Sequence, residues 1–179
     1  MRVIGGSLKG RRIEPPSKHW PVRPTTDFAR EALFNILDNR LDYNGISALD
    51  LFGGTGVHSI ELASRGCMDI TYVERYSQSI RWMKQLAQLW SLPVIVIQSD
   101  VMTFLKNITR QWDYIFADPP YDMKGLELFP SIVFESAALL PDGLFVMEHK
   151  QQIRFQDHPG FLEARTYGQT VFSFFTAGS

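Results

Sequence analysis

The sequence has one cysteine, Cys67, and no long apolar run. A single cysteine excludes an intramolecular disulfide and a zinc site built from several thiolates, and it is typical of a reducing compartment. No apolar stretch approaches the roughly 20 residues that a membrane-spanning helix needs, and residues 1–6 do not resemble the apolar core of a secretory signal. We therefore expect a soluble, cytoplasmic protein with no membrane partner.

The composition also lacks the extremes that mark non-globular chains. Of the 179 residues, 45% are hydrophobic and 21% are charged, which is close to the average for soluble globular proteins. These proportions exclude wholesale disorder, a collagen-like chain and a coiled coil, and the sequence has no internal repeat. The length suits one domain, because domains usually contain about 100–200 residues.

The net charge of −1 conceals an uneven distribution. Residues 1–31 carry seven Lys or Arg against three acids, a net of +4, so the rest of the chain has a net of −5. A basic segment on an acidic body is typical of a protein that holds phosphates at one edge, and an ordinary solvated N-terminus is the alternative. We predict a basic N-terminal extension over residues 1–26 and the main domain over residues 27–179.

From residue 46 onward, short β-rich runs alternate with amphipathic helical stretches. The pattern predicts strands at 46–52, 70–74, 94–98, 114–118 and 144–148, and helices at 77–90, at 101–108, before residue 65 and from about residue 27. Such alternation indicates βαβ units, hence an α/β fold with a mostly parallel sheet and helices on both faces. The runs 161–167 and 170–176 flank Gly168-Gln169 and predict a terminal antiparallel hairpin.

A glycine-rich turn between a strand and a helix is the strongest local feature, Asp50-Leu51-Phe52-Gly53-Gly54-Thr55-Gly56. Small residues let the backbone approach a ligand, and ligands bind beyond the carboxyl ends of parallel strands. Glu74 ends the second strand, where a carboxylate can accept both hydroxyls of a ribose, and Asp100 follows the third, where it can receive an adenine amino group. These acids favour a nucleoside ligand. A dinucleotide would need a third glycine where Ser59 stands, and an α/β turn without a ligand is the plainer alternative.

The second feature is Asp118-Pro119-Pro120-Tyr121, which follows the fourth strand. An exocyclic amine of a nucleobase is a poor nucleophile, because its lone pair is delocalised into the ring. Asp118 can accept one amine hydrogen and the Pro119 carbonyl another, which would direct the lone pair toward an electrophilic carbon. The prolines stiffen the loop, and Tyr121 offers a ring on which an extruded base can stack. A strand-terminating Asp-Pro turn with a packed tyrosine is the alternative.

Together, the turn at 50–56 and the tetrapeptide at 118–121 resemble the class I S-adenosylmethionine-dependent methyltransferases that modify exocyclic amines of nucleobases. Toward the N-terminus, Ile4-Gly5-Gly6, Lys9-Gly10-Arg11 and Arg23-Pro24-Thr25-Thr26-Asp27 are similar to the bacterial family that methylates guanine N2 in the 16S rRNA of the small ribosomal subunit. The resemblance covers nearly the whole chain.

The resemblance implies a Rossmann-like fold with a seven-stranded, mostly parallel sheet, and direct methyl transfer from S-adenosylmethionine without a metal, leaving S-adenosylhomocysteine. It implies 16S rRNA as the partner, within a small-subunit assembly particle, and we expect a monomer. The residues that it assigns to the cofactor are Asp50, Phe52, Gly53, Gly54, Gly56, Glu74, Asp100 and Val101. The residues that it assigns to catalysis are Asp118, Pro119, Pro120 and Tyr121. Gly54 and Val57-His58 depart from the small, apolar pattern expected of the turn, which leaves His58 open between a cofactor contact and a packed or solvated residue.

The basic extension then becomes the expected contact with RNA. The residues predicted to bind it are Arg11, Arg12, Arg23, Thr25, Thr26 and Arg30. For Arg23 and Arg30, the alternative is a salt bridge with Asp27 or Glu31 that anchors the extension to the body.

Other functions are compatible with these motifs. An adenine-N6 methyltransferase acting on DNA or RNA shares the tetrapeptide, although the DNA enzymes usually need an insertion for which 179 residues leave no room. A methyltransferase-like module that holds RNA without turnover is a second alternative, and a nicotinamide oxidoreductase is a distant one. The sequence does not decide which guanine is modified, or whether Asp118 or water takes the proton.

Overall fold

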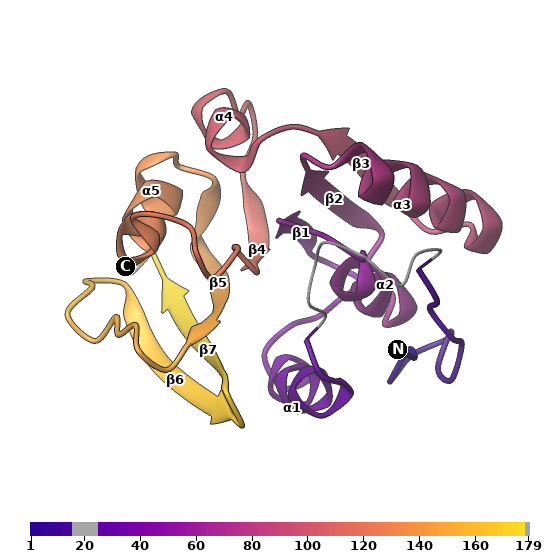
Figure 1. Cartoon of the computed structure of the whole chain (residues 1–179), viewed down its shortest axis with the longest axis horizontal. Coiled ribbons are helices and arrows are strands. Elements are labelled where there is room, and N and C mark those ends of the chain that lie inside the picture. The colour runs from indigo at the N-terminus through magenta and orange to yellow at the C-terminus, as the bar shows by residue number, and fades with distance from the viewer. Residues whose placement is uncertain (16–24, 178–179) are drawn as a thin grey trace.

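The computed structural model describes residues 1–15 and 25–177 of the chain, and the predicted RNA contact Arg23 lies outside these ranges. In the described part, seven strands form one sheet in the order β3-β2-β1-β4-β5-β7-β6 (Figure 1). Their bounds are β1 Ser47–Leu51, β2 Asp69–Glu74, β3 Val94–Gln98, β4 Trp112–Ala117, β5 Leu139–Lys150, β6 Phe161–Tyr167 and β7 Thr170–Thr176. Strands β1 to β5 pair in parallel, whereas β7 runs antiparallel to both β5 and β6. The predicted α/β fold with a C-terminal antiparallel hairpin is confirmed.

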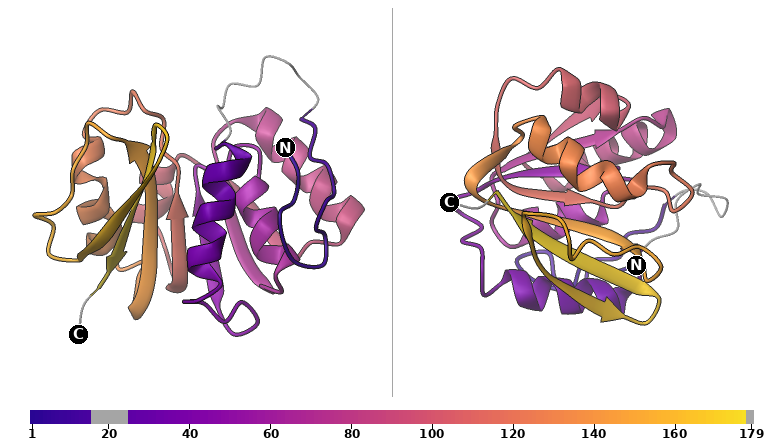
Figure 2. Two further views of the ribbon diagram at one scale, coloured as in Figure 1. Left: turned by 90° about the horizontal axis from the view of Figure 1, so that it is seen from below. Right: turned by 90° about the vertical axis from the view of Figure 1, so that its left-hand side faces the viewer.

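Helices cover both faces of this sheet (Figures 1 and 2). One face carries α1 (Asp27–Leu37), α2 (Val57–Ser64) and α3 (Ser77–Trp90), and the other carries α4 (Val101–Lys106), the 3₁₀ turn η1 (Leu126–Leu128) and α5 (Phe129–Glu135). Successive side chains of a strand point to opposite faces. Ala48 of β1 therefore packs with the side chains of α1, while Leu49 and Leu51 pack with those of α4 and α5. Strands that are buried on both faces explain the nearly continuous apolar runs in the sequence.

Two features between β4 and β5 differ from the prediction. Helix α5 was not expected, and it buries Phe129 and Val133 while placing Pro130 in its first turn, where proline costs no helical hydrogen bond. Strand β5 was expected only at 144–148 but begins at Leu139. Pro141 and Gly143 break the apolar pattern there, and the sheet accommodates them with a register shift opposite β4.

The first part of the predicted extension folds back on itself and packs on the domain. The backbone of Val3 donates to the carbonyl of Arg11 at 2.9 Å, and Ile13 donates to the carbonyl of Met1 at 3.0 Å. The buried side chains of Val3 and Ile13 join a cluster with α2 and α3, and Figure 2 shows this segment beside those helices. Residues 1–13 thus share a core with the domain, and the division of the chain after residue 26 stays a prediction.

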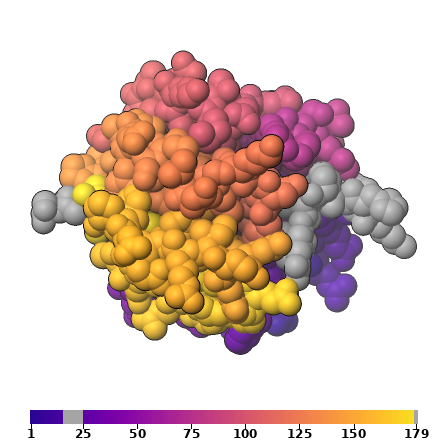
Figure 3. Space-filling model, turned by 60° about the vertical axis from the view of Figure 1, so that its left-hand side comes forward, coloured from indigo at the N-terminus to yellow at the C-terminus, as the bar shows by residue number. Residues whose placement is uncertain are grey.

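The C-terminal strands form the side of the molecule that faces the viewer in Figure 3, below the segment that includes α5. Within residues 1–15 and 25–177, every helix is too short or too polar to span a bilayer.

Candidate functional site

The chain leaves β1 through a turn that uses left-handed backbone repeatedly. Gly54 and Gly56 have φ angles of 52° and 77°, which glycine adopts without steric cost. Gly53 is required for space, because a Cβ atom there would lie 2.1 Å from the ring of Tyr72. Phe52 adopts a φ of 60° although it is not glycine, a conformation that costs energy. This backbone places its ring 5.5 Å from that of Phe129, at the wall of a cleft described below.

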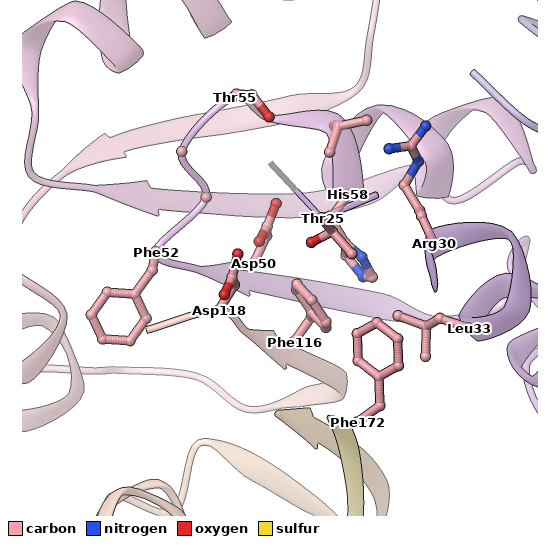
Figure 4. A pocket seen from close by; sticks show the side chains of 13 residues that line it. Thr25, Arg30, Leu33, Asp50, Phe52, Thr55, His58, Phe116, Asp118 and Phe172 are labelled. Carbon is pink, nitrogen blue, oxygen red and sulfur yellow. The ribbon is translucent and has the colours of Figure 1, made fainter. Parts of the chain in front are cut away.

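Asp50, the last acid before this turn, is buried and ties β1 to α2. Its Oδ2 accepts hydrogen bonds from the backbone N and the Oγ of Ser59, at 3.2 and 2.6 Å. Burial raises the pKa of Asp50 to about 7. With Asp118 it lines a cavity of about 30 Å³ beneath the turn, enough for a single water molecule. Figure 4 shows the two carboxylates pointing into the same space, while the ring of Phe52 turns away from them.

Glu74 is held at the end of β2 by backbone donors. Its Oε1 accepts from the N–H groups of Arg75 and Tyr76, at 2.6 and 2.9 Å, and its Oε2 accepts from Gly54 at 3.1 Å. The carboxylate therefore links β2 to the glycine turn and has a fixed orientation. Because each carboxylate oxygen has two lone pairs, Oε2 can accept a further hydroxyl.

Asp100 stands at the corresponding place after β3, where it caps α4. Its Oδ1 accepts from the backbone N of Thr103 at 3.1 Å, and the residue is exposed. Val101 packs beneath it in the core. The carboxylate thus has a defined position at the rim of the same cleft.

These elements enclose a cleft of about 530 Å³, a usual size for a small-molecule site. The predicted cofactor residues that line it are Phe52, Glu74, Asp100 and Val101, and all four tetrapeptide residues line it as well. Asp50, Gly53 and Gly54 line the small cavity behind it instead, and Gly56 lines neither. Carboxylates that can accept ribose hydroxyls and an adenine amine, next to apolar surfaces, fit the nucleoside part of S-adenosylmethionine. The gathering of negative charge fits its sulfonium cation.

The tetrapeptide begins directly after β4. The backbone N of Asp118 donates to the carbonyl of Leu51 at 3.3 Å, which joins the loop to the end of β1. Burial, together with the negative charges of Glu148 and Asp50, raises the pKa of Asp118 well above the usual range of an aspartate. The carbonyl of Pro120 accepts from the backbone N of Met123 at 2.9 Å and closes a turn.

Tyr121 separates the cleft from a second cavity. Its hydroxyl donates to Oε1 of Glu148 at 3.3 Å, and the Lys150 ammonium lies 4.8 Å from the centre of its ring. Burial and the charge of Glu148 raise the pKa of Tyr121 to about 12. The second cavity has a volume of about 340 Å³ and a polar lining that includes Thr25, Glu148 and Lys150.

Glu148 is the site residue that the sequence prediction missed. Ala117 pairs with Met147 across β4 and β5, so the next residues along the two strands, Asp118 and Glu148, are neighbours. Only 2% of Glu148 is exposed, and its Oε2 accepts from the hydroxyl of Thr25 at 2.6 Å. The signal in the sequence was an acid at the end of the fifth predicted strand, the same position that drew attention to Glu74.

The predicted RNA contacts do not gather at one place. Arg11 and Arg12 are exposed, the first with its guanidinium 5.2 Å from the centre of the Trp90 ring on α3 and the second 3.9 Å from Glu14. Thr26 caps α1 by accepting from the backbone N of Ala29 at 3.2 Å. Of the predicted RNA contacts that the structure describes, Thr25 and Thr26 line the second cavity.

Arg30 requires a correction, because its side chain is only 2% exposed. Its Nη2 donates to the carbonyl of Arg2 at 2.6 Å and to Asp27 at 2.9 Å, and its Nε donates to Glu61 at 3.3 Å. Glu61 also accepts from the backbone N of Ile4 at 2.7 Å. The structure therefore gives Arg30 the anchoring role that was the alternative, through Asp27 and Glu61, and its charge is not accessible to a phosphate.

His58 is a packed residue of α2. Its ring lies beside that of Phe116 (Figure 4) and stacks on it with 3.7 Å between the ring centres. Its Nε2 lies 3.1 Å from the hydroxyl of Tyr114. Burial and the charges of Arg30 and Arg65 lower the pKa of His58 well below its usual value, so the imidazole is neutral. It supports the floor of the small cavity beneath the turn.

Known proteins resemble this chain over most of its length. A Bacillus subtilis protein named "Putative rRNA methyltransferase YlbH" is 33% identical over 178 residues, which is 95% of each chain. The Escherichia coli K12 protein named "Ribosomal RNA small subunit methyltransferase D" is 32% identical over 149 residues, 83% of this chain and 74% of that one.

Solved structures resemble it as well. The Escherichia coli structure described as "Putative methyltransferase yhhF" has a TM-score of 0.82 at 27% identity, over 98% of this chain and 96% of that one. A Thermus thermophilus 16S rRNA N2 G1207 methyltransferase in complex with AdoMet and guanosine has a TM-score of 0.69 at 22% identity, over 85% of this chain and 43% of that one. These neighbours confirm the class I methyltransferase fold. The family model described as "Conserved hypothetical protein 95" matches residues 1–176, and the chain belongs to that family.

Proposed function

We propose that this protein transfers a methyl group from S-adenosylmethionine to the exocyclic N2 of a guanine in 16S rRNA. The observation that carries the proposal is the position of Asp118, which lines the cleft with Glu74 and Asp100 and neighbours Glu148, a lining residue of the cavity beyond Tyr121. Relatives that match most of the chain are named as rRNA methyltransferases, and one of them as a small-subunit enzyme. The assignment of guanine N2 as the methylated atom rests on the tetrapeptide and on the resemblance of the N-terminal motifs to the guanine-N2 methyltransferase family.

In the cleft, each predicted side chain has a task that its geometry permits. Glu74 accepts one ribose hydroxyl through Oε2, and Asp100 receives the adenine amino group at the rim. Phe52 and Val101 provide apolar surfaces for the adenine, and the glycine turn lets the backbone come close to the ligand. S-adenosylmethionine supplies a methyl group on a sulfonium, which is a good leaving group.

The tetrapeptide orients the acceptor. Asp118 accepts one hydrogen of guanine N2 and the Pro119 carbonyl accepts the other, so the nitrogen lone pair faces the methyl carbon. A carbon–nitrogen bond forms as the carbon–sulfur bond breaks, which leaves S-adenosylhomocysteine and one surplus proton on N2. Asp118 has a raised pKa, which suits it to take this proton directly or to pass it to water.

The RNA is held by the remaining predicted residues. Tyr121 stacks on the extruded guanine, and Thr25, at the cavity, contacts the nucleotide. The exposed Arg11 and Arg12 bind phosphates, as does Arg23 in the extension, and the start of α1 at Thr26 offers backbone N–H groups. The substrate is a small-subunit assembly particle in the cytoplasm, which a monomer of this size can recognise with the help of the particle's own structure, and no metal takes part.

Nucleoside mass spectrometry tests the proposal. Small-subunit particles, free 16S rRNA and adenine-rich DNA are incubated with the protein and S-adenosylmethionine, then digested. The RNA comes from cells that lack this activity, so that the target stays unmodified. We expect new N2-methylguanosine with the particle, and none with the Asp118→Ala variant. N6-methyladenine in the DNA would move the protein to the adenine-N6 class, and no product in any sample would favour a non-catalytic RNA-binding module.

A further inference from the structure

A second acid, Glu148, stands beside Asp118 and has no role in the methyl transfer described above. Glu148 follows Met147 on β5 as Asp118 follows Ala117 on β4, so the two carboxylates occupy neighbouring positions on the same face of the sheet. Only 2% of Glu148 is exposed. Burying a carboxylate is costly unless donors surround it. Glu148 also lines the cavity beyond Tyr121, so its carboxylate can be reached by a ligand there.

Two hydroxyls fix the Glu148 carboxylate in place. Thr25 donates to Oε2 at 2.6 Å from the segment before α1, and Tyr121 donates to Oε1 at 3.3 Å from the tetrapeptide. Each oxygen of a carboxylate can accept two hydrogen bonds. A group that is oriented from two sides can therefore accept a donor from a base in a defined direction.

The cavity that Glu148 lines has the character of a base site. It has a volume of about 340 Å³ and lies on the far side of Tyr121 from the cofactor cleft. Its other polar lining groups include Thr26, Lys150, Gln151, Gln152, Gln169 and Thr170. Amides, hydroxyls and one ammonium can satisfy the polar edges of a purine, and Tyr121 at the boundary can stack on its face.

We propose that Glu148 selects guanine over adenine by accepting the N1–H of the target base, an inference that rests on the proposed function. Guanine has an N1–H donor beside its exocyclic amine, whereas adenine has a lone pair on N1 beside its own. When the amine lies between Asp118 and the Pro119 carbonyl, the neighbouring ring nitrogen faces Glu148. The carboxylate then forms a charge-assisted hydrogen bond with guanine and repels the lone pair of adenine.

The test uses RNA with guanine or 2-aminopurine at the target position. 2-Aminopurine keeps the N2 amine but has a lone pair on N1, and it lacks O6. We expect wild-type kcat/KM to favour guanine by about 10²-fold. In Glu148→Gln, the side-chain amide can donate to N1 of 2-aminopurine, so the ratio should fall to about 10-fold or less. Any penalty for the missing O6 is common to both enzymes and cancels.

Two further variants separate selection from structural support. Glu135→Gln makes the same change of charge on an exposed residue of α5 and should leave both rates and their ratio unchanged. Thr25→Val removes a donor to Glu148 but keeps the carboxylate, so the rates on both substrates should fall together. Measurements are made well above the pH at which Asp118 takes up a proton, because removing the charge of Glu148 also changes that pKa.

Three outcomes decide the inference, and a fourth decides the proposed function. A ratio that falls in Glu148→Gln while S-adenosylmethionine affinity stays within a few-fold supports the inference. Equal loss on both substrates would overturn it and leave Glu148 a structural residue. A wild-type ratio near one would overturn it even if the variant fails to fold. Wild-type protein that makes no N2-methylguanosine on the guanine RNA or on particles would instead refute the proposed function itself.

Discussion

The two cavities that meet at Tyr121 are built from different kinds of segment. The cofactor cleft is lined by residues at or just beyond the ends of β1, β2, β3 and β4, with Glu74 ending β2 and Asp100 following β3. The second cavity, on the other side of Tyr121, is called the polar cavity here. It is lined by the end of β5, the turn before β7 and Thr25, which lies far away in the sequence. Parallel strands bring their carboxyl ends to one edge by topology alone. The polar cavity instead depends on how the C-terminal hairpin and the start of α1 pack against the sheet.

The acids of the two cavities are also held differently. Glu74 accepts hydrogen bonds from three backbone N–H groups, whereas Glu148 accepts the hydroxyls of Thr25 and Tyr121. Backbone donors persist when side chains change, but hydroxyl donors can be lost by a single substitution. The orientation of Glu74 should therefore tolerate substitution of neighbouring side chains, whereas the orientation of Glu148 depends on two of them.

Asp118 borders the cofactor cleft and neighbours Glu148 of the other cavity, so its loss should have the largest effect. Asp118→Ala should lower kcat by about 10³-fold, because an oriented acceptor at the reacting amine is lost. The S-adenosylmethionine Kd from calorimetry should stay within a few-fold. Retained single-turnover transfer would exclude the proposed orientation of the amine.

A change on the cofactor side should leave the RNA side intact. Glu74→Ala should weaken S-adenosylmethionine binding by about 10- to 100-fold, since a hydrogen bond to a charged group is worth about 1.5–3 kcal/mol. RNA affinity in a filter-binding assay should not change, and Thr25→Val should show the reverse pattern. Parallel losses of both ligands in either variant would mean that the two cavities are not independent.

The pH profile sharpens the comparison between the two acids at the border. The pKa of Asp118 is raised by burial and by the charges of Glu148 and Asp50, so its protonated form appears at a higher pH than usual. The ionised form is the acceptor, so kcat should fall by about tenfold per unit below that apparent pKa. An aspartate with an ordinary pKa of about 3.9 would keep the rate constant down to about pH 5. A kcat that stays constant between neutral pH and about pH 5 would contradict the raised pKa. Glu148→Gln should shift the fall of kcat in acid to lower pH, because it removes one of the charges that raise the pKa of Asp118.

The smallest effect is expected far from both cavities. Replacing Arg11 and Arg12 together by alanine should weaken RNA binding and reduce the slope of log K against log salt by about 0.7 per lost contact to single-stranded RNA. Because Arg11 rests on Trp90, Trp90→Ala is a useful companion that frees its guanidinium without removing its charge. An unchanged slope in the double variant would mean that both arginines are solvated and make no contact with RNA phosphates.

The cofactor side could be predicted because its information is local. An acid after a strand and glycines before a helix lie within a few residues of the element that places them, as at Glu74 and Gly54. The contacts between Thr25 and Glu148 and between Arg30 and Glu61 join residues far apart in sequence. No short pattern specifies such partners. The same reason explains why α5 was not predicted, since its three buried residues pack only against the finished sheet.

The buried anchor of Arg30 makes the N-terminal segment and the rim of the polar cavity one mechanical unit. Glu61 of α2 holds both Arg30 and the backbone of Ile4, and Arg30 also grips the carbonyl of Arg2. Thr25, five residues before Arg30, stands at the start of the same helix and touches Glu148. The first residues of the chain and the wall of that cavity are therefore connected through α1, because Arg30 lies near the start of this helix and Thr25 just before it.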